Sequence, residues 1–314
     1  MDPLDDLPRI ELGTWPTPVR RLAAVSDELG VEVWAKLEED CGAWGGNKVR
    51  KLEHIFEEAL RSHIHTLVTW GAATSNWTAA AALHGPPAGF DVVLGLGGTI
   101  PDDYTRLYDD LGTRVFRFPH LVLAPLALTV ARATAGRTVR YLPVGGSGTV
   151  GDLGSARAGA EVAAAISSGE LPSPTHAFVA TGSSGTAAGL AVGLGLGGAL
   201  VTVVAVKVSD WPYATTHMVT GRINSLLLRL EELGIRNVVP ARWFLDRDHL
   251  GRGYGKATPE SRAAIDLAAK DGLVLDPTYG AKAFAALIGH ARREGAGPYL
   301  FVHTSPTRPA PLPD

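Results

Sequence analysis

A lysine that follows a glycine turn has surroundings that indicate chemistry. Lys48 comes after Gly45-Gly46-Asn47, and apolar residues then recur with helical spacing at Val49, Leu52, Ile55, Phe56, Ala59 and Leu60. A cation in the first turn of a helix opposes the helix dipole, so a charged Lys48 would be poorly placed. A neutral amine, as in a Schiff base, would remove that conflict. We therefore interpret Lys48 as a reactive amine, against the alternative of a solvated surface lysine beside Arg50 and Lys51.

Two loops rich in hydroxyl groups could bind anions close to such an amine. Ser75 and Asn76 follow a strand-like run and precede an alanine-rich helix, where free backbone amides suit a carboxylate. Either residue could instead serve only as a helix N-cap. The run from Thr181 to Thr186 opens another helix and offers hydroxyls and backbone amides that suit a phosphate. It lacks a P-loop lysine, and the alternative is a tight turn between a strand and a helix.

Further polar residues occur late in the chain. Tyr279 precedes a helix, Tyr254 lies between two glycines, and Thr304 follows the last strand-like run. Tyr279 could only pack beneath its helix, and Thr304 could only end its strand. Residues 146–151 and 193–198 also match the GxGxxG pattern literally, which keeps nicotinamide dinucleotide binding as an alternative.

The elements that must position these residues alternate between strands and helices. Apolar, β-rich runs separated by helical patterns are predicted at Val31–Leu37, Thr66–Trp70, Val92–Leu96, Thr113–Phe118, Val139–Leu142, Ala177–Ala180, Leu200–Val208, Ile235–Val239 and Tyr299–His303. Such alternation predicts an α/β fold with parallel sheets covered by helices. Nine strands are too many for one simple sheet of this length, so we expect two. Ligands in such folds bind at the carboxyl ends of the strands, where the polar loops lie.

The composition excludes several classes of protein. The 314 residues carry a net charge of -3 without a long basic run, which argues against nucleic acid as the main partner. The single cysteine, Cys41, excludes an intrachain disulfide and favours a reducing compartment. The acidic start lacks the features of a signal peptide, so the cytoplasm is expected. The uncharged stretch from Ala177 to Val206 is rich in glycine and is interpreted as a buried β-α-β unit, so no membrane segment is predicted. The histidines have no metal-ligand spacing, and no metal is expected.

Taken in order, the motifs resemble those of a known family. They are Gly-Gly-Asn-Lys48-Val-Arg-Lys-Leu-Glu, Ser75-Asn76, Pro143 to Ser147, Thr181 to Thr186, Gly253-Tyr254-Gly255, Leu275 to Tyr279 and His303-Thr304. This set resembles the 1-aminocyclopropane-1-carboxylate deaminase and D-cysteine desulfhydrase family of pyridoxal phosphate enzymes, from Leu12 to Thr304. The resemblance implies the tryptophan synthase β-like fold (fold type II), with two domains, each built on a largely parallel sheet flanked by helices. It places a large domain at 1–48 and 160–314 and a small inserted domain at 49–159.

The resemblance also implies a role for each matched residue. Lys48 would bind the cofactor, pyridoxal 5'-phosphate, as a Schiff base and then act as the base at Cα. Ser75 would contact the substrate carboxylate or move a proton, and Tyr254 and Tyr279 would face the substrate. The remaining cofactor-binding residues would be Asn47 beside the lysine, Asn76 at the ring oxygen, Gly182, Ser183, Ser184, Gly185 and Thr186 at the phosphate, and Thr304 at the pyridine nitrogen. A hydroxyl there would leave that nitrogen largely unprotonated, which favours elimination over transamination.

The chain departs from the family pattern at several positions. Trp77 replaces a polar residue, Ser184 replaces a glycine, and Ser305-Pro306 replaces a Gly-Gly pair. Gly280 stands where the deaminases have glutamate and the desulfhydrases threonine, so cyclopropane opening is disfavoured. Trp77 and Trp44 predict a larger or more apolar substrate pocket.

The predicted function is α,β-elimination from a small amino acid, giving a 2-oxo acid and ammonia, in a homodimer. The alternatives are β-replacement, racemisation or cyclopropane opening with the same cofactor. An alternative of another class is a nicotinamide-binding or non-catalytic Rossmann-like protein.

Overall fold

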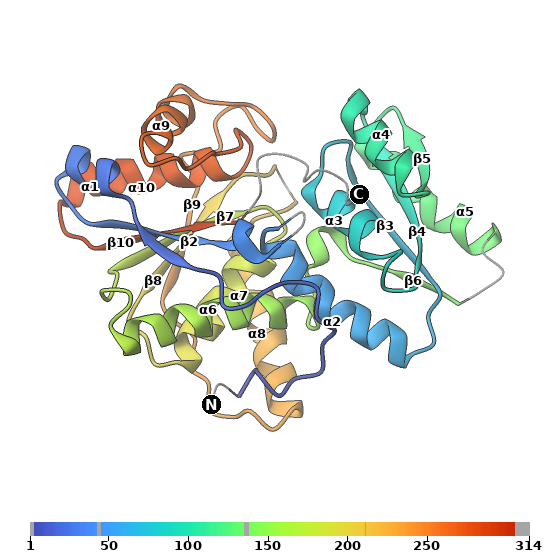
Figure 1. Ribbon diagram of the computed structural model, residues 1–314, viewed down its shortest axis with the longest axis horizontal. Coiled ribbons are helices and arrows are strands. Elements are labelled where there is room, and N and C mark those ends of the chain that lie inside the picture. The colour runs from blue at the N-terminus through green and yellow to red at the C-terminus, as the bar shows by residue number, and fades with distance from the viewer. Residues whose placement is uncertain (1–2, 43–44, 135–137, 211, 305–314) are drawn as a thin grey trace.

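The protein has two sheets, each lying in its own lobe (Figure 1). The computed structural model describes residues 3–42, 45–134, 138–210 and 212–304. The six-stranded sheet has the order β1-β2-β10-β7-β8-β9 and the four-stranded sheet the order β5-β4-β3-β6. Within the described residues, no helix is long and apolar enough to cross a membrane.

All neighbouring strands are parallel except β1, which pairs with β2 in the antiparallel direction. The strands of the larger sheet are β1 (Val19–Arg21), β2 (Val33–Leu37), β7 (His176–Thr181), β8 (Thr202–Lys207), β9 (Trp243–Asp246) and β10 (Tyr299–His303). Those of the smaller sheet are β3 (Thr66–Ala72), β4 (Asp91–Gly97), β5 (Arg114–Phe118) and β6 (Val139–Tyr141). The predicted α/β class with two largely parallel sheets is confirmed.

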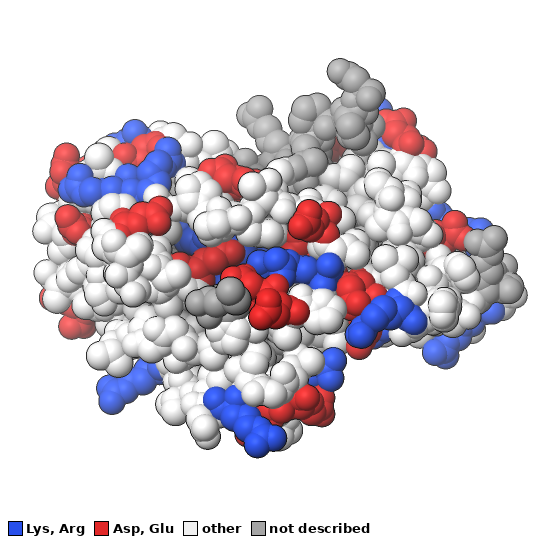
Figure 2. All heavy atoms as spheres, turned by 60° about the horizontal axis from the view of Figure 1, so that its bottom comes forward, with Lys and Arg blue, Asp and Glu red and all other residues white. Residues whose placement is uncertain are grey.

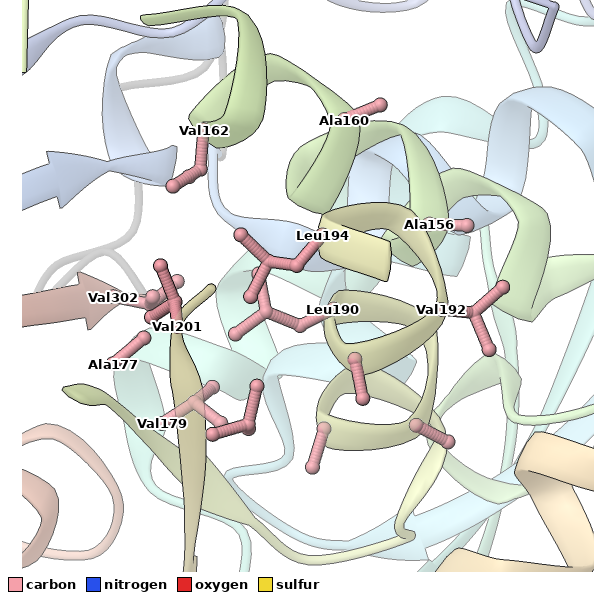
Figure 3. Packing of buried hydrophobic residues seen from close by; sticks show 14 of the residues in the cluster. Ala156, Ala160, Val162, Ala177, Val179, Leu190, Val192, Leu194, Val201 and Val302 are labelled. Carbon is pink, nitrogen blue, oxygen red and sulfur yellow. The ribbon is translucent and has the colours of Figure 1, made fainter. Parts of the chain in front are cut away.

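Helices cover both faces of the larger sheet because alternate strand residues are apolar on both sides. One face carries α6 (Gly151–Ser168), α7 (Gly185–Leu196) and α8 (Thr216–Glu232). The opposite face carries α1 (Ala23–Leu29), α9 (Pro259–Ala269) and α10 (Gly280–Glu294). Figure 3 shows the first face, where Leu190 and Leu194 of α7 pack towards Val179 and Val201 at the sheet.

The smaller sheet is covered in the same way. One face packs against α2 (Asn47–Arg61), α3 (Asn76–His84) and α4 (Asp102–Asp110), and the other against α5 (Leu126–Thr134). Short 3₁₀ turns lie at η1 (Glu38–Cys41), η2 (Leu121–Leu123) and η3 (Val144–Gly146). Helix α2 packs against both α3 and α6, so it joins the two lobes. The domain boundaries at 48/49 and 159/160 remain a prediction.

Two strand assignments differ from the sequence prediction. Residues 235–239 form no strand, because Gly234 ends α8 in a left-handed conformation and the Ile235 amide donates to the carbonyl of Leu230. This geometry uses an apolar residue after the glycine as a helix cap, so the apolar pattern did not mark a strand. The strand in this region is β9 instead, and the sequence prediction missed β1 as well.

The helix predicted after Lys48 is present, with one residue misplaced. Val49, Leu52, Ile55, Phe56 and Ala59 are buried as predicted, but Leu60 is 44% exposed. Leu60 lies in the last turn of α2, outside the buried cluster that packs on the small sheet.

The charged side chains are mixed on the surface. On the face that Figure 2 shows, Lys and Arg lie among Asp and Glu, without a wide area of one sign. This distribution fits the small net charge of -3.

Candidate active site

A cavity of about 370 Å³ is lined by residues at the ends of strands from both sheets. It receives the ends of β3 and β7 and the residue after β10, so the polar loops meet at the carboxyl ends of the strands, as predicted. The predicted site residues that line it are Asn47, Lys48, Ser75, Asn76, Gly182, Ser183, Ser184, Thr186, Tyr254, Tyr279 and Thr304. Gly185 does not line the cavity and is buried as the first residue of α7.

The start of α2 places Lys48 in this cavity. A side chain at Gly45 would come within 2.0 Å of the Glu39 carbonyl, and Gly46 has a φ of 100°, so the sharp entry to the helix requires both glycines. The Asn47 amide donates to the Thr304 carbonyl at 2.9 Å, which ties the helix start to the end of β10. The Asn47 side chain then donates to Thr186 Oγ1 at 2.6 Å. Lys48 is therefore held between the hydroxyl loop and the last strand.

The Lys48 amine is prepared to be neutral. Burial, reinforced by the charge of Lys51, lowers the pKa of Lys48 to about 7 against the opposing effect of Asp152. Its amine has no hydrogen-bond partner among the residues that the structure describes. These properties agree with the conflict expected for a charged lysine at a helix start.

The cofactor-free protein should therefore react through Lys48 with a pH midpoint near 7. Trapping pyridoxal on the protein with borohydride at pH 5 to 11, followed by peptide mass analysis, measures that midpoint. Because Lys51 helps to lower the pKa of Lys48, Lys51→Met should move the midpoint to higher pH. A midpoint near the ordinary lysine value of 10.5 in the wild-type protein would contradict the assignment.

The loop after β7 has the features of a phosphate site. Ser184 adopts a left-handed conformation, with a φ of 70°, immediately before α7. Its Oγ, like Asn47 Oδ1, is buried without a partner among the described residues. The first backbone amides of α7 have no acceptor within the helix, so they can donate hydrogen bonds to an anion. An unpaired buried hydroxyl is costly, and Ser184 Oγ can donate to a phosphate oxygen, whereas Asn47 Oδ1 can only accept a hydrogen bond. The loop therefore fits the phosphate of the predicted cofactor.

A buried ion pair behind this loop was not predicted from the sequence. Lys51 Nζ lies 3.2 Å from Asp152 Oδ1 and 3.1 Å from Ser147 Oγ, and Lys51 and Asp152 are almost fully buried. A side chain at Gly185 would come within 2.7 Å of Lys51 Nζ, which places this cation directly against the loop. Ser147 Oγ in turn lies 2.7 Å from Ser183 Oγ. In the sequence, Lys51 was considered only as a neighbour of Lys48 in the surface alternative that was not adopted, and its burial within α2 was not predicted.

Ser75 is a helix N-cap that also lines the cavity. Its Oγ accepts the Trp77 amide at 3.3 Å, so it is the N-cap of α3. It also lines the cavity, beside Asn76 as the first residue of that helix. An N-terminus that opens into a cavity is suited to a carboxylate.

The two predicted tyrosines, Tyr254 and Tyr279, form a hydrogen-bonded pair in the lining of the cavity. The hydroxyl groups of Tyr254 and Tyr279 share a hydrogen bond of 2.6 Å. Burial raises the pKa of both phenols, that of Tyr279 well above its ordinary value of 10, so both are protonated at neutral pH. The Asp276 carboxylate accepts the amides of Thr278, Tyr279 and Gly280 and fixes the turn that carries Tyr279. The pair can therefore donate a proton into the cavity.

Gly280 follows Tyr279, which lines the cavity, but is itself buried and is not a lining residue. A carbon atom added there would lie 3.2 Å from Asp276 Oδ2 and 3.7 Å from His303 Cδ2. Thr304, which is 5% exposed, is the hydroxyl residue in this region that lines the cavity.

The literal glycine fingerprints have packing roles. A side chain at Gly193 would come within 1.8 Å of the Ala156 carbonyl, and one at Gly197 within 2.3 Å of Ala163 Cβ. These glycines let α6 and α7 approach closely, which explains the second pattern without a dinucleotide. The first pattern lies in the turn from η3 into α6.

Trp77 is 2% exposed, and its indole nitrogen donates to Thr69 Oγ1 at 2.7 Å while the residue contributes to the cavity wall. Trp44, Ser305 and Pro306, also named in the sequence analysis, lie outside the described residues. Residues that line the cavity and were not predicted include Trp70, Leu121, Ser209, Asp210 and Tyr213.

The fold is shared with solved pyridoxal phosphate enzymes. Threonine deaminase isoform 2 from Solanum lycopersicum has a TM-score of 0.68 at 17% identity, over 97% of this chain and 86% of its own. A crystal structure described as the ACC deaminase homologue has a TM-score of 0.84 at 30% identity, over 96% of this chain and 93% of its own. The architecture and the site define a pyridoxal phosphate enzyme of fold type II.

The sequence places the chain within this class. Residues 10–305 match the family described as pyridoxal-phosphate dependent enzyme, and the chain belongs to that family. A D-cysteine desulfhydrase of Klebsiella pneumoniae is 35% identical over 327 residues, which cover 96% of this chain and 94% of the relative. A Pyrococcus furiosus protein provisionally named 1-aminocyclopropane-1-carboxylate deaminase is 33% identical over 311 residues, with 96% and 92% coverage. The predicted cofactor and family are confirmed, and the nicotinamide alternative is set aside.

Proposed function

We propose that this enzyme removes a β substituent from a small amino acid by α,β-elimination and releases a 2-oxo acid and ammonia. The observation that carries the proposal is that Lys48, the Ser75 helix start and the Tyr254–Tyr279 pair line one cavity. Relatives named for desulfhydrase and deaminase activities support this class of reaction.

The residues divide the work of binding and proton transfer. Pyridoxal phosphate, when bound, supplies the electron sink that makes the substrate's Cα–H acidic. The loop at 182–186 and the N-terminus of α7 would hold its phosphate, and Lys48 would hold it covalently. Ser75 Oγ and the first amides of α3 bind the substrate carboxylate. The Lys48 amine, whose pKa is about 7, would accept the Cα proton of the bound substrate.

The tyrosine pair completes the elimination. As the bond from Cβ to the substituent breaks, a neutral phenol of Tyr254 or Tyr279 donates a proton to the leaving group. Water then hydrolyses the released enamine to a 2-oxo acid and ammonia. Gly280 stands where the related deaminases have glutamate, so the family resemblance favours elimination over cyclopropane opening.

A panel of amino acids tests this function directly. Purified protein with added cofactor is incubated with D- and L-cysteine, serine, O-acetylserine, β-chloroalanine and 1-aminocyclopropane-1-carboxylate. We expect equal amounts of 2-oxo acid and ammonia from at least one β-substituted amino acid and neither product from the cyclopropane. A racemised or β-substituted amino acid without any 2-oxo acid would refute elimination and favour the alternatives.

We also propose that the enzyme acts as a cytoplasmic homodimer. The single cysteine, Cys41, is buried, which fits a reducing compartment. Exposed apolar side chains that could be covered by a second copy include Leu200, Leu228 and Val239. Sedimentation equilibrium of the holoenzyme tests the dimer, and a mass near 33.0 kDa would contradict it.

A further inference from the structure

A buried lysine outside the cofactor site occupies the start of helix α10. Lys282 is the third residue of α10 and has no exposed surface. An ammonium group in the first turn of a helix opposes the helix dipole, and its burial removes hydration. Lys282 is therefore unfavourable for the stability of α10 alone, and its partners must account for it.

Those partners belong to the loop that carries Tyr254. Lys282 Nζ donates to the carbonyl of Leu250 at 2.7 Å and to that of Gly253 at 2.9 Å. Both acceptors are backbone atoms, so the contact fixes the path of the chain. No carboxylate lies within ion-pair distance of Lys282 among the described residues.

A second contact holds the same loop from the other side. The Tyr254 amide donates to Asp210 Oδ2 at 3.0 Å, and a side chain at Gly253 would come within 3.0 Å of that carboxylate. Gly253 and Gly255 have φ angles of 121° and 70°, so the backbone around Tyr254 is intrinsically permissive. A loop of this kind needs external contacts to present one side chain in one position.

Helix α10 thus controls both members of the tyrosine pair. Tyr279 immediately precedes α10, and Lys282 lies in its first turn, where it binds the loop of Tyr254. The two hydroxyl groups, 2.6 Å apart, meet only if the loop and the helix start keep their relative positions. A displacement of about 1 Å at a catalytic group can lower the rate about a hundredfold.

We propose that Lys282 is a positioning residue that, with Asp210, holds the Tyr254 loop so that Tyr254 and Tyr279 face the substrate as a pair. The expected effect of Lys282 on turnover rests on the proposed elimination. Its expected effect on the position of the Tyr254 loop does not.

The loop itself gives a test that needs no activity. Arg252 and Lys256 are exposed trypsin sites on either side of Tyr254. In Lys282→Met holoenzyme, cleavage at these sites should be at least about tenfold faster than in wild type, because local opening controls proteolysis. Lys282→Arg should retain most of the protection. Lys270→Met is the matched control, because it removes an exposed lysine at the C-terminal end of the neighbouring helix α9. It should be cleaved at the wild-type rate. Equal cleavage of wild type and Lys282→Met would overturn the proposal.

A double-mutant cycle separates positioning from general support of the fold. Lys282→Met should lower kcat/KM about a hundredfold in the wild-type background. In a Tyr254→Phe background it should lower kcat/KM less than about threefold, because the hydroxyl group that Lys282 positions is already absent. Loss by the same factor in both backgrounds would show a merely structural role and reject the proposal. If the wild-type enzyme forms no 2-oxo acid, the proposed function fails while the trypsin comparison still decides the role of Lys282. If Lys282→Met does not fold, Lys282→Gln replaces it in both tests.

Discussion

Lys48→Ala is expected to abolish turnover, with a loss in kcat of about a thousandfold or more. Among the described residues, Lys48 is the only lysine that lines the cavity. Its depressed pKa, about 7, suits both covalent attachment of the cofactor and removal of a proton at neutral pH. Alanine removes both functions, whereas the phosphate loop and the Ser75 helix start remain in place.

The measurement combines turnover, visible absorbance and mass. The wild-type protein should gain the mass of the cofactor at Lys48 after borohydride reduction, and the variant should not. Lys270→Ala changes an exposed lysine that pairs with Glu28 on the surface, and it should keep activity and labelling unchanged. Wild-type labelling at another lysine, or a variant that retains turnover, would remove Lys48 from its assigned role.

The parts of the site that the sequence could predict are those carried by local motifs at strand ends. Lys48, Ser75 and the loop at 182–186 each lie between a strand-like run and a helical pattern. Parallel strands bring the loops of one sheet to one edge, which accounts for Lys48 and the loop at 182–186. The approach of Ser75, which follows β3 of the smaller sheet, depends on how the two sheets face each other. Tyr254 and Tyr279 depended on the family resemblance, since no periodicity distinguishes a catalytic tyrosine from a packed one.

The residues that escaped prediction have partners far away in the chain. Lys51 meets Asp152, and Lys282 meets Gly253, through contacts that only the tertiary structure creates. In the sequence, such lysines look like ordinary surface residues at helix starts. The strand predicted at residues 235–239 was wrong for a different reason. An apolar residue that caps a helix and an apolar residue in a strand give the same local pattern.

Arg50→Met is expected to lower the free energy of unfolding by about 3–5 kcal/mol, because it leaves buried carboxylates without their partner. Arg50 Nε lies 2.6 Å from Glu38 Oε2, and Arg50 Nη2 lies 2.6 Å from Glu161 Oε2. Arg50 and Glu38 are at most 1% exposed. Lys36 also contacts Glu161, at 2.7 Å, but cannot replace the paired contacts of the guanidinium group. Since Arg50 and Lys48 share the first turns of α2, this network also anchors the catalytic helix.

Urea denaturation at several pH values tests both the size and the origin of this loss. Burial alone would raise the pKa of Glu161, but Arg50 and Lys36 hold it at about 2, below the ordinary value of 4.5. The stabilisation from this carboxylate is therefore complete above pH 4.5 and is lost as the pH falls towards 2. The difference between wild type and Arg50→Met should shrink over the same interval. Arg61→Met, on the same helix, removes an exposed pair with Glu57 and should cost less than about 1 kcal/mol. A loss of that small size for Arg50→Met, or one that does not change with pH, would show that the network does not anchor α2.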